Sequence, residues 1–358
     1  MSTYHSGLSS LPSCGARTTW DAIGPSAVEP GSATGSAAAM RATESRARSL
    51  AWSLQAPRPL PGPLAADYHG RRQLAADVDS QDNVYVMNRG QHPIIVFDSD
   101  GNFLRSWGEG EFDRRAHGIC ASVDDFIWTV NDNQHCVKKY TLEGELVLTI
   151  GKQFEPAEKW SGNPFHTPTN VAVSPVSGDV YITDGYGNSR VHRYAPDGRH
   201  IVSWGEAGVG PGQFQIPHNV VIDSDENVFV NDRENSRVQV FDKNGVLQEI
   251  WPYLYRPQAL AMDKSGIIYV GEQLQIPELF DHPGLGHRLN VLSHNGKLLA
   301  RLGSTERGDA PTEFIAPHGM AVDSKGNLYV GEVSFVNLGV RFDPPVYYKV
   351  FRRLSRIS

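Results

Sequence analysis

Three histidines recur at nearly equal intervals along the chain, and their spacing is the first sign of a functional site. They are His117, His218 and His318, so 101 and 100 residues separate successive members. Neutral imidazole nitrogens are common ligands of zinc, and three such ligands with one open position form a catalytic metal site. If the fold brings the three rings together, they can hold one zinc ion, or another divalent transition metal that accepts histidine.

The histidines lie in an internal repeat of about half their spacing. One half of the repeat is an apolar stretch, a polar turn and an alternating strand, as in HGICASVDDFIWTVN and HGMAVDSKGNLYVGE. The other half is a hairpin such as VFDSDGNFLRSWG, whose turn contains glycine because glycine accepts positive φ. Six repeats of four short strands predict an all-β fold, a six-bladed β-propeller. Histidine fills one position of every second repeat, so the three rings are expected to surround the central axis.

The two ends of the propeller sequence are expected to meet. The sixth repeat has a third strand near Tyr347–Arg352 but no recognisable fourth, and a segment around Leu50–Gln55 is expected to supply it. Residues 1–60 are rich in Ser, Ala, Gly and Pro, which predicts a flexible extension apart from that strand. Residues 61–358 are predicted to form the catalytic propeller domain.

The composition narrows the choice of partners and compartment. The formal net charge of -7 argues against nucleic acid as the main partner. No apolar run approaches the roughly 20 residues that a membrane-spanning helix needs. The chain has three cysteines and its N-terminal residues lack a signal-peptide pattern, so a reducing, cytoplasmic location is expected. We expect a monomer that acts on a small-molecule or peptide-derived substrate.

Further polar residues are expected to converge with the histidines on one face of the propeller, here called the mouth. The loop after each second strand opens on the face where the innermost strands begin, and Arg89, Tyr186 and Arg233 lie in such loops. These three residues break the repeat pattern, and cations and a phenol beside a metal suit substrate binding and proton transfer. We therefore predict that they are catalytic, and that Arg89 and Arg233, together with Glu272 and Glu332, bind the substrate.

Structural interpretations compete with these functional ones. The histidines can be seen as copies inherited by the repeat, but the equivalent positions of the other repeats hold Leu74, Thr169 and Gln258. The scaffold therefore does not require histidine there. Structural roles are instead predicted for other repeat residues: turn binding for Asp132, Asp184 and Asp232, bracing for Arg190 and Arg237, and blade packing for Trp107, Trp204 and Trp251.

Two stretches of the chain resemble a known enzyme family. They are PTNVAVSPVSGDVYITDGYGNSRVHRYAPDGRHIVSWGE and GPGQFQIPHNVVIDSDENVFVNDRENSRVQVF, and they are similar to peptidyl-α-hydroxyglycine α-amidating lyase, which is built on NHL-type repeats. The resemblance covers roughly residues 70 to 350. It implies zinc bound by the three histidines, a catalytic tyrosine at Tyr186 and active-site arginines at Arg89 and Arg233. The reaction of that family cleaves the N–C bond of a carbinolamide and releases an amide and glyoxylate.

The chain departs from the family pattern at several positions. Ala316 replaces a methionine that lines the substrate pocket, and Gly319 replaces an aspartate that serves a structural calcium, which puts the calcium in question. Gly187 and Phe229 stand where secreted members place disulfide cysteines, which favours an intracellular relative. Our interpretation is a metal-dependent carbon–nitrogen lyase acting on an α-hydroxyglycine-like substrate. The alternatives are a metal-dependent hydrolase of a lactone or ester at the same site, and a non-enzymatic NHL scaffold that binds proteins.

Overall fold

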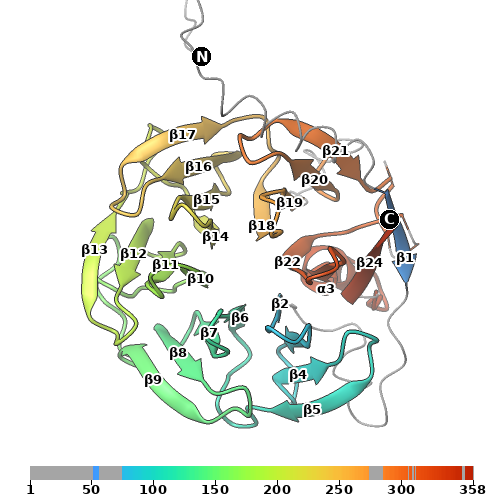
Figure 1. Cartoon of the computed structure of the whole chain (residues 1–358), viewed down its shortest axis with the longest axis horizontal. Coiled ribbons are helices and arrows are strands. Elements are labelled where there is room, and N and C mark those ends of the chain that lie inside the picture. The colour runs from blue at the N-terminus through green and yellow to red at the C-terminus, as the bar shows by residue number, and fades with distance from the viewer. Residues whose placement is uncertain are drawn as a thin grey trace, which may run out of the picture. The chain divides into compact units, whose positions relative to one another are not determined.

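The chain divides into two units, Met1–Met40 and Arg41–Ser358, and the residues that the structure describes all belong to the second. In this computed structural model they are residues 51–55, 75–273, 285–304, 306–308, 310, 312–348 and 351–357. They form six four-stranded antiparallel sheets, which are arranged as blades around a central axis (Figure 1). The predicted six-bladed β-propeller is confirmed.

Within each of the first five blades, the strands follow chain order from the axis outward. Blade one consists of β2 (Ala75–Val78), β3 (Val84–Met87), β4 (Ile94–Phe97) and β5 (Phe103–Trp107). Blade two consists of β6 (Ala116–Ala121), β7 (Ile127–Asn131), β8 (Cys136–Tyr140) and β9 (Leu146–Gly151). Blade three consists of β10 (Asn170–Val173), β11 (Val180–Asp184), β12 (Arg190–Tyr194) and β13 (His200–Trp204).

The second half of the ring repeats this order until the last blade. Blade four consists of β14 (Pro217–Ile222), β15 (Val228–Asp232), β16 (Arg237–Phe241) and β17 (Leu247–Trp251). Blade five consists of β18 (Pro257–Met262), β19 (Ile268–Glu272), β20 (Leu289–Leu292) and β21 (Leu298–Leu302). Blade six consists of β22 (Pro317–Val322), β23 (Leu328–Glu332), β24 (Phe351–Ile357) and β1 (Ala51–Gln55).

Blade six joins the two ends of the propeller sequence. The outermost strand, β1, pairs antiparallel with β24, with Ala51 opposite Ile357 and Gln55 opposite Arg353. The segment expected to close the ring therefore does so. The third strand begins at Phe351, later than predicted, because α3 (Ser334–Asn337) and the short helix η2 (Gly339–Arg341) are inserted after β23. The predicted boundary at residue 60 lies outside the described residues.

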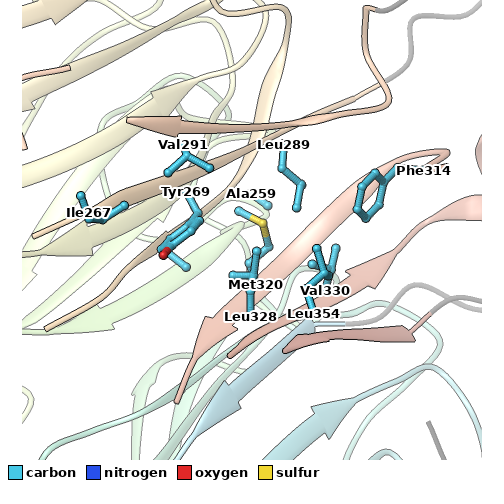
Figure 2. Close-up of a cluster of buried hydrophobic side chains, with 11 residues drawn as sticks. Ala259, Ile267, Tyr269, Leu289, Val291, Phe314, Met320, Leu328, Val330 and Leu354 are labelled. Atoms are coloured by element: carbon cyan, nitrogen blue, oxygen red, sulfur yellow. The ribbon is translucent and has the colours of Figure 1, made fainter. Parts of the chain in front are cut away.

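The blades are held together by apolar clusters between neighbouring sheets. The second strands of blades two to six are buried at every position, whereas outer strands such as β9 are mostly exposed. Figure 2 shows the cluster between blades five and six, where Tyr269 and Val291 pack with Met320 and Val330. Burial of apolar surface between neighbouring sheets therefore stabilises the ring.

The tryptophans that end the outer strands pack against the next blades, as predicted. A Cβ atom added to Gly144, Gly245 or Gly296 would lie 2.6 Å from the ring of Trp107, Trp204 or Trp251, respectively. Each of these glycines has a positive φ in a hairpin turn, so both the turn and the contact require glycine.

The six innermost strands surround a central cavity of about 280 Å³. Its wall includes residues of β2, β6, β10, β14, β18 and β22, and the three spaced histidines lie along it. Among the described residues, no helix is long and apolar enough to cross a membrane.

Candidate metal centre

The three histidines meet at the axis of the propeller. His117, His218 and His318 lie on the innermost strands of blades two, four and six, and each side chain is buried. Their ring centroids are 5.0, 4.8 and 5.0 Å apart, which is close to threefold symmetry. Their potential ligand atoms all lie within 4.8 Å of one another. The alternation seen in the sequence therefore produces a compact cluster of three imidazoles.

A local irregularity in each inner strand turns the histidine out of the regular ladder. The pairing register shifts at His117, between Ala116 and Gly118, and the same shift occurs around His218 and His318. Such a bulge redirects a side chain at the end of a strand. A Cβ atom on Gly319 would lie 2.6 Å from the Cα of Ala75, so the backbone of blade one fills the space that an aspartate there would need.

Backbone carbonyl groups fix the orientation of two of the rings. Nδ1 of His117 lies 2.6 Å from the carbonyl oxygen of Thr169, and Nδ1 of His218 lies 2.9 Å from that of Gln258. A carbonyl oxygen only accepts hydrogen bonds, so Nδ1 carries the proton and Nε2 keeps its lone pair. Thr169 and Gln258 occupy the histidine position of blades three and five. The blades without a histidine thus orient the ligands of their neighbours.

The surroundings keep His117 and His218 neutral, which is the form of histidine that binds metals. Burial holds the pKa of His117 well below the ordinary value, and the positive charges of His318 and Arg89 lower it further. Burial likewise holds the pKa of His218 well below the ordinary value, with Arg233 as the next cause. The neutral imidazoles of His117 and His218, whose Nδ1 hydrogen bonds leave their Nε2 lone pairs available, fit a divalent transition metal together with His318 beside them.

Tyr186 contacts the histidines directly. Its hydroxyl oxygen lies 2.9 Å from Nε2 of His117 and 3.2 Å from Nε2 of His218. The residue follows β11, and Gly185 before it allows close approach to blade four, because a Cβ there would lie 2.1 Å from the carbonyl oxygen of Pro217. The phenol is thus placed between two nitrogens that are candidate metal ligands.

Two arginines flank this group. The guanidinium carbon of Arg233 lies 5.7 Å from the centre of the Tyr186 ring, and its Nε donates to Glu234 at 2.8 Å. Nε of Arg89 donates to the carbonyl oxygen of Ala116 at 2.9 Å, one residue before a histidine. The structure therefore brings Arg89, Tyr186 and Arg233 to the histidines. Their roles in catalysis and substrate binding stay predictions.

A third arginine at the mouth was missed from the sequence. Arg115 precedes His117 by two residues, contributes to the lowered pKa of that histidine, and pairs with Asp132 at 2.8 Å from Nε to Oδ1. The sequence arguments considered only the loops after second strands, whereas Arg115 lies in the loop before an innermost strand. Its position two residues before His117 is the feature of the sequence that could have identified it.

Glu272 and Glu332 are buried and engaged within their own blades. Glu272 accepts hydrogen bonds from Arg288 and Asn290 at 2.9 and 2.8 Å. Glu332 accepts from Arg352 at 2.9 Å and from the amides of Ile315 and Ala316. In blades three and four, Asp184 and Asp232 accept hydrogen bonds from the amides of His166 and Gln215, as predicted. Asp132 of blade two instead accepts from the side chain of Arg115. These contacts give both glutamates a structural role, and substrate binding by them stays a prediction.

Comparison with known proteins places the chain in a family. The NHL repeat family matches residues 165–194 and 214–241. NHL repeat-containing protein 3 of Homo sapiens is 35% identical over 292 residues, which cover 76% of this chain and 79% of that protein. The chain belongs to this NHL-repeat family.

Other relatives of this NHL-repeat protein carry enzyme names. Peptidyl-glycine alpha-amidating monooxygenase B of Xenopus laevis is 30% identical over 75% of the chain. Peptidyl-alpha-hydroxyglycine alpha-amidating lyase 1 of Drosophila melanogaster is 31% identical over 65% of the chain. The match spans 31% of the length of the first protein and 45% of the second.

Proposed function

We propose that this NHL-repeat protein is a metal-dependent carbon–nitrogen lyase. Its substrate would be a carbinolamide of the α-hydroxyglycine type, which is cleaved to an amide and an aldehyde such as glyoxylate. The observation that carries the proposal is the hydroxyl of Tyr186 between Nε2 of His117 and Nε2 of His218. Similarity to proteins named as amidating lyases supports the same reaction.

The metal would be held by His117, His218 and His318, whose donor set suits zinc and also accepts other divalent transition ions. When bound, such an ion supplies Lewis acidity and favours the ionised form of a nearby hydroxyl group. The Nδ1 hydrogen bonds of His117 and His218 hold their rings in a binding orientation before any ion arrives.

Tyr186 would act as the proton-transfer group. In this proposal Tyr186 reacts as its phenolate, beside the guanidinium of Arg233. The phenolate takes the proton of the substrate hydroxyl, the C–O bond becomes a carbonyl, and the C–N bond breaks with its electron pair passing to nitrogen. The departing amide nitrogen then takes a proton from the tyrosine. The atoms balance without water, which separates this lyase reaction from hydrolysis.

The two arginines would position the substrate. Arg89 and Arg233 are each anchored through Nε, to the carbonyl oxygen of Ala116 and to Glu234. An anchored guanidinium can hold a carboxylate with a defined orientation, which aligns the carbinol carbon for collapse.

The first experiment is elemental analysis of the native protein and His218→Ala, purified without added metal. We expect about one equivalent of a transition metal in the native protein and its loss in the variant. Release of glyoxylate from an N-acyl-α-hydroxyglycine is then compared between the native protein and Tyr186→Phe, which is expected to keep the metal and lose activity. Lactone hydrolysis retained by Tyr186→Phe would favour the hydrolase. A protein that binds no metal even when zinc is supplied would leave the scaffold interpretation.

A further inference from the structure

The segment between blades two and three contacts the backbone on both sides of Tyr186. This segment, residues 152–168, is called the connector. The amide of Tyr186 donates to the carbonyl oxygen of Thr167 at 3.3 Å, and the amide of Trp160 donates to the carbonyl oxygen of Gly187 at 2.9 Å. The amide of Gly162 donates to the side chain of Asn188 at 2.9 Å. The connector therefore determines where the backbone of Tyr186 lies.

Close packing makes this contact rigid. A Cβ atom on Gly187 would lie 2.2 Å from Cδ2 of His166 and 2.5 Å from its carbonyl oxygen. On the other side, Gly185 packs against Pro217 of blade four. Tyr186 thus stands between two glycines, each in contact with a different part of the protein, and a shift of the connector would displace the phenol.

One side chain outside the connector binds its last turn. The amide of Thr167 donates to Nδ1 of His135 at 3.0 Å, and His135 lies in the turn between β7 and β8. Thr167 has a φ of 66°, in the left-handed region that non-glycine residues rarely adopt. The hydrogen bond to His135 therefore helps to maintain the strained backbone of Thr167, whose own carbonyl oxygen accepts from the amide of Tyr186.

The charge of His135 decides whether this hydrogen bond exists. An unprotonated Nδ1 accepts from the amide, whereas a protonated Nδ1 would face it with a second donor. The titratable groups that face His135 are His166 of the connector, at 5.7 Å between ring centroids, and Asp184 at the end of β11. Burial lowers the pKa of His135, His166 lowers it further, and Asp184 opposes both. The neutral form is therefore the resting form at neutral pH.

We propose that His135 is a positioning residue for Tyr186, that it acts through the connector, and that acidification releases the connector by protonating it. The effect on turnover rests on the proposed lyase function, whereas the release of the connector does not.

Two variants separate the hydrogen bond from the backbone conformation. His135 has a φ of 54°, which both asparagine and glycine tolerate. In His135→Asn, Oδ1 is as many bonds from the backbone as Nδ1 is in histidine, so the acceptor remains but no longer titrates. In His135→Gly the acceptor is gone. Gly187→Ala is a third variant, which disturbs the connector from its other side by displacing His166.

Hydrogen–deuterium exchange of the connector amides gives a readout that needs no activity. At neutral pH, we expect exchange at Thr167 to be on the order of fivefold faster in His135→Gly than in the native protein, the factor for loss of one hydrogen bond. His135→Asn is expected to match the native protein, and Gly187→Ala to resemble His135→Gly. At acidic pH the native protein should approach His135→Gly while His135→Asn stays protected. Equal exchange in all variants would refute the proposal.

Turnover of the carbinolamide substrate tests the consequence for Tyr186. We expect kcat of His135→Gly to fall by a factor on the order of ten or more, because small displacements of a reacting group have effects of this size. The metal content of His135→Gly should equal that of the native protein. His135→Asn should keep the native kcat at neutral pH, and its fall in kcat at acidic pH should occur at a lower pH than in the native protein. If the exchange pattern is as expected but the native protein lacks lyase activity, the proposed function fails, whereas the proposed control of the connector by His135 stands. Normal kcat in His135→Gly despite faster exchange would refute the positioning role.

Discussion

Asp77 allows a quantitative test of how the central cavity affects stability. Its carboxylate accepts hydrogen bonds from the amides of Val78 and Ala121, both at 2.8 Å, and it lines the cavity. Burial raises the pKa of Asp77 to about 7 from 3.8, although the two backbone amides and Cys120 lower it. The folded protein therefore binds this proton more tightly than the unfolded chain does.

The sign and size of the effect follow from linkage. A raised pKa in the folded state gives stability that is fully present below the unfolded pKa of 3.8 and is lost as the pH rises to about 7. About two pH units separate pH 5 from the folded pKa, and each unit changes the free energy of unfolding by roughly 1.4 kcal/mol. The largest loss of stability over this range is therefore about 3 kcal/mol. Because the carboxyl group of Asp77 borders the cavity, water screens part of the electrostatic effect. We therefore expect a loss of stability on the order of 1.5 kcal/mol.

The measurement is urea unfolding of the native protein and Asp77→Asn at about pH 5 and about pH 8. The native protein should lose about 1.5 kcal/mol more than the variant over this range, since asparagine does not titrate. Loss of an amide hydrogen bond in the variant lowers its free energy of unfolding equally at both pH values, so this effect cancels when the two pH values are compared. The same pH dependence in both proteins would refute a proton on Asp77 at neutral pH.

Three further predictions concern the blades and the metal centre. Glu332→Gln should lower the free energy of unfolding by about 3 kcal/mol, because it leaves buried Arg352 without its charge partner. The KM for the substrate should not change. Unchanged stability with a raised KM would instead indicate that Glu332 contacts the substrate. Gly245→Ala should lower the thermal midpoint more than Gly101→Ala, because both glycines have positive φ but only the first has a tryptophan 2.6 Å from the added Cβ; equal shifts would mean that Trp204 yields at no cost. Removal of the metal by a chelator should lower the free energy of unfolding of the native protein by about 2.7 kcal/mol, compared with protein in metal at a hundredfold of its Kd. His218→Ala should show no such loss when both proteins are compared by thermal melting.

The repeat explains how much of the fold and site could be predicted from the sequence. Histidine at one position of alternate repeats predicted a threefold cluster, since equivalent residues of a closed ring are equidistant from its axis. Tyr186 and the two arginines were found because they differ from their repeat equivalents. The late start of β24 was not found, because α3 and η2 are an insertion that the repeat does not contain.

Other features of the site lacked a residue-type signal. The acceptors for Nδ1 of His117 and His218 are backbone carbonyl groups, which every residue possesses, so nothing in Thr169 or Gln258 identified them. The contact of His135 with Thr167 depends on the conformation of the connector, which has no regular strand or helix. The sequence also did not reveal that Glu272 and Glu332 accept hydrogen bonds from buried basic groups, and substrate binding by them stays a prediction.

The pairing of β1 with β24 constrains how the protein can be made. Ala51 emerges from the ribosome first, yet its partner, Ile357, is synthesised 306 positions later. At translation rates of roughly 5–20 residues per second, β1 waits about 15 to 60 s without its partner. Blades one to five can form during that time, because each uses consecutive strands. The last blade can form only after synthesis reaches β24, so closure of the ring is a late folding event governed by a contact between residues 306 positions apart.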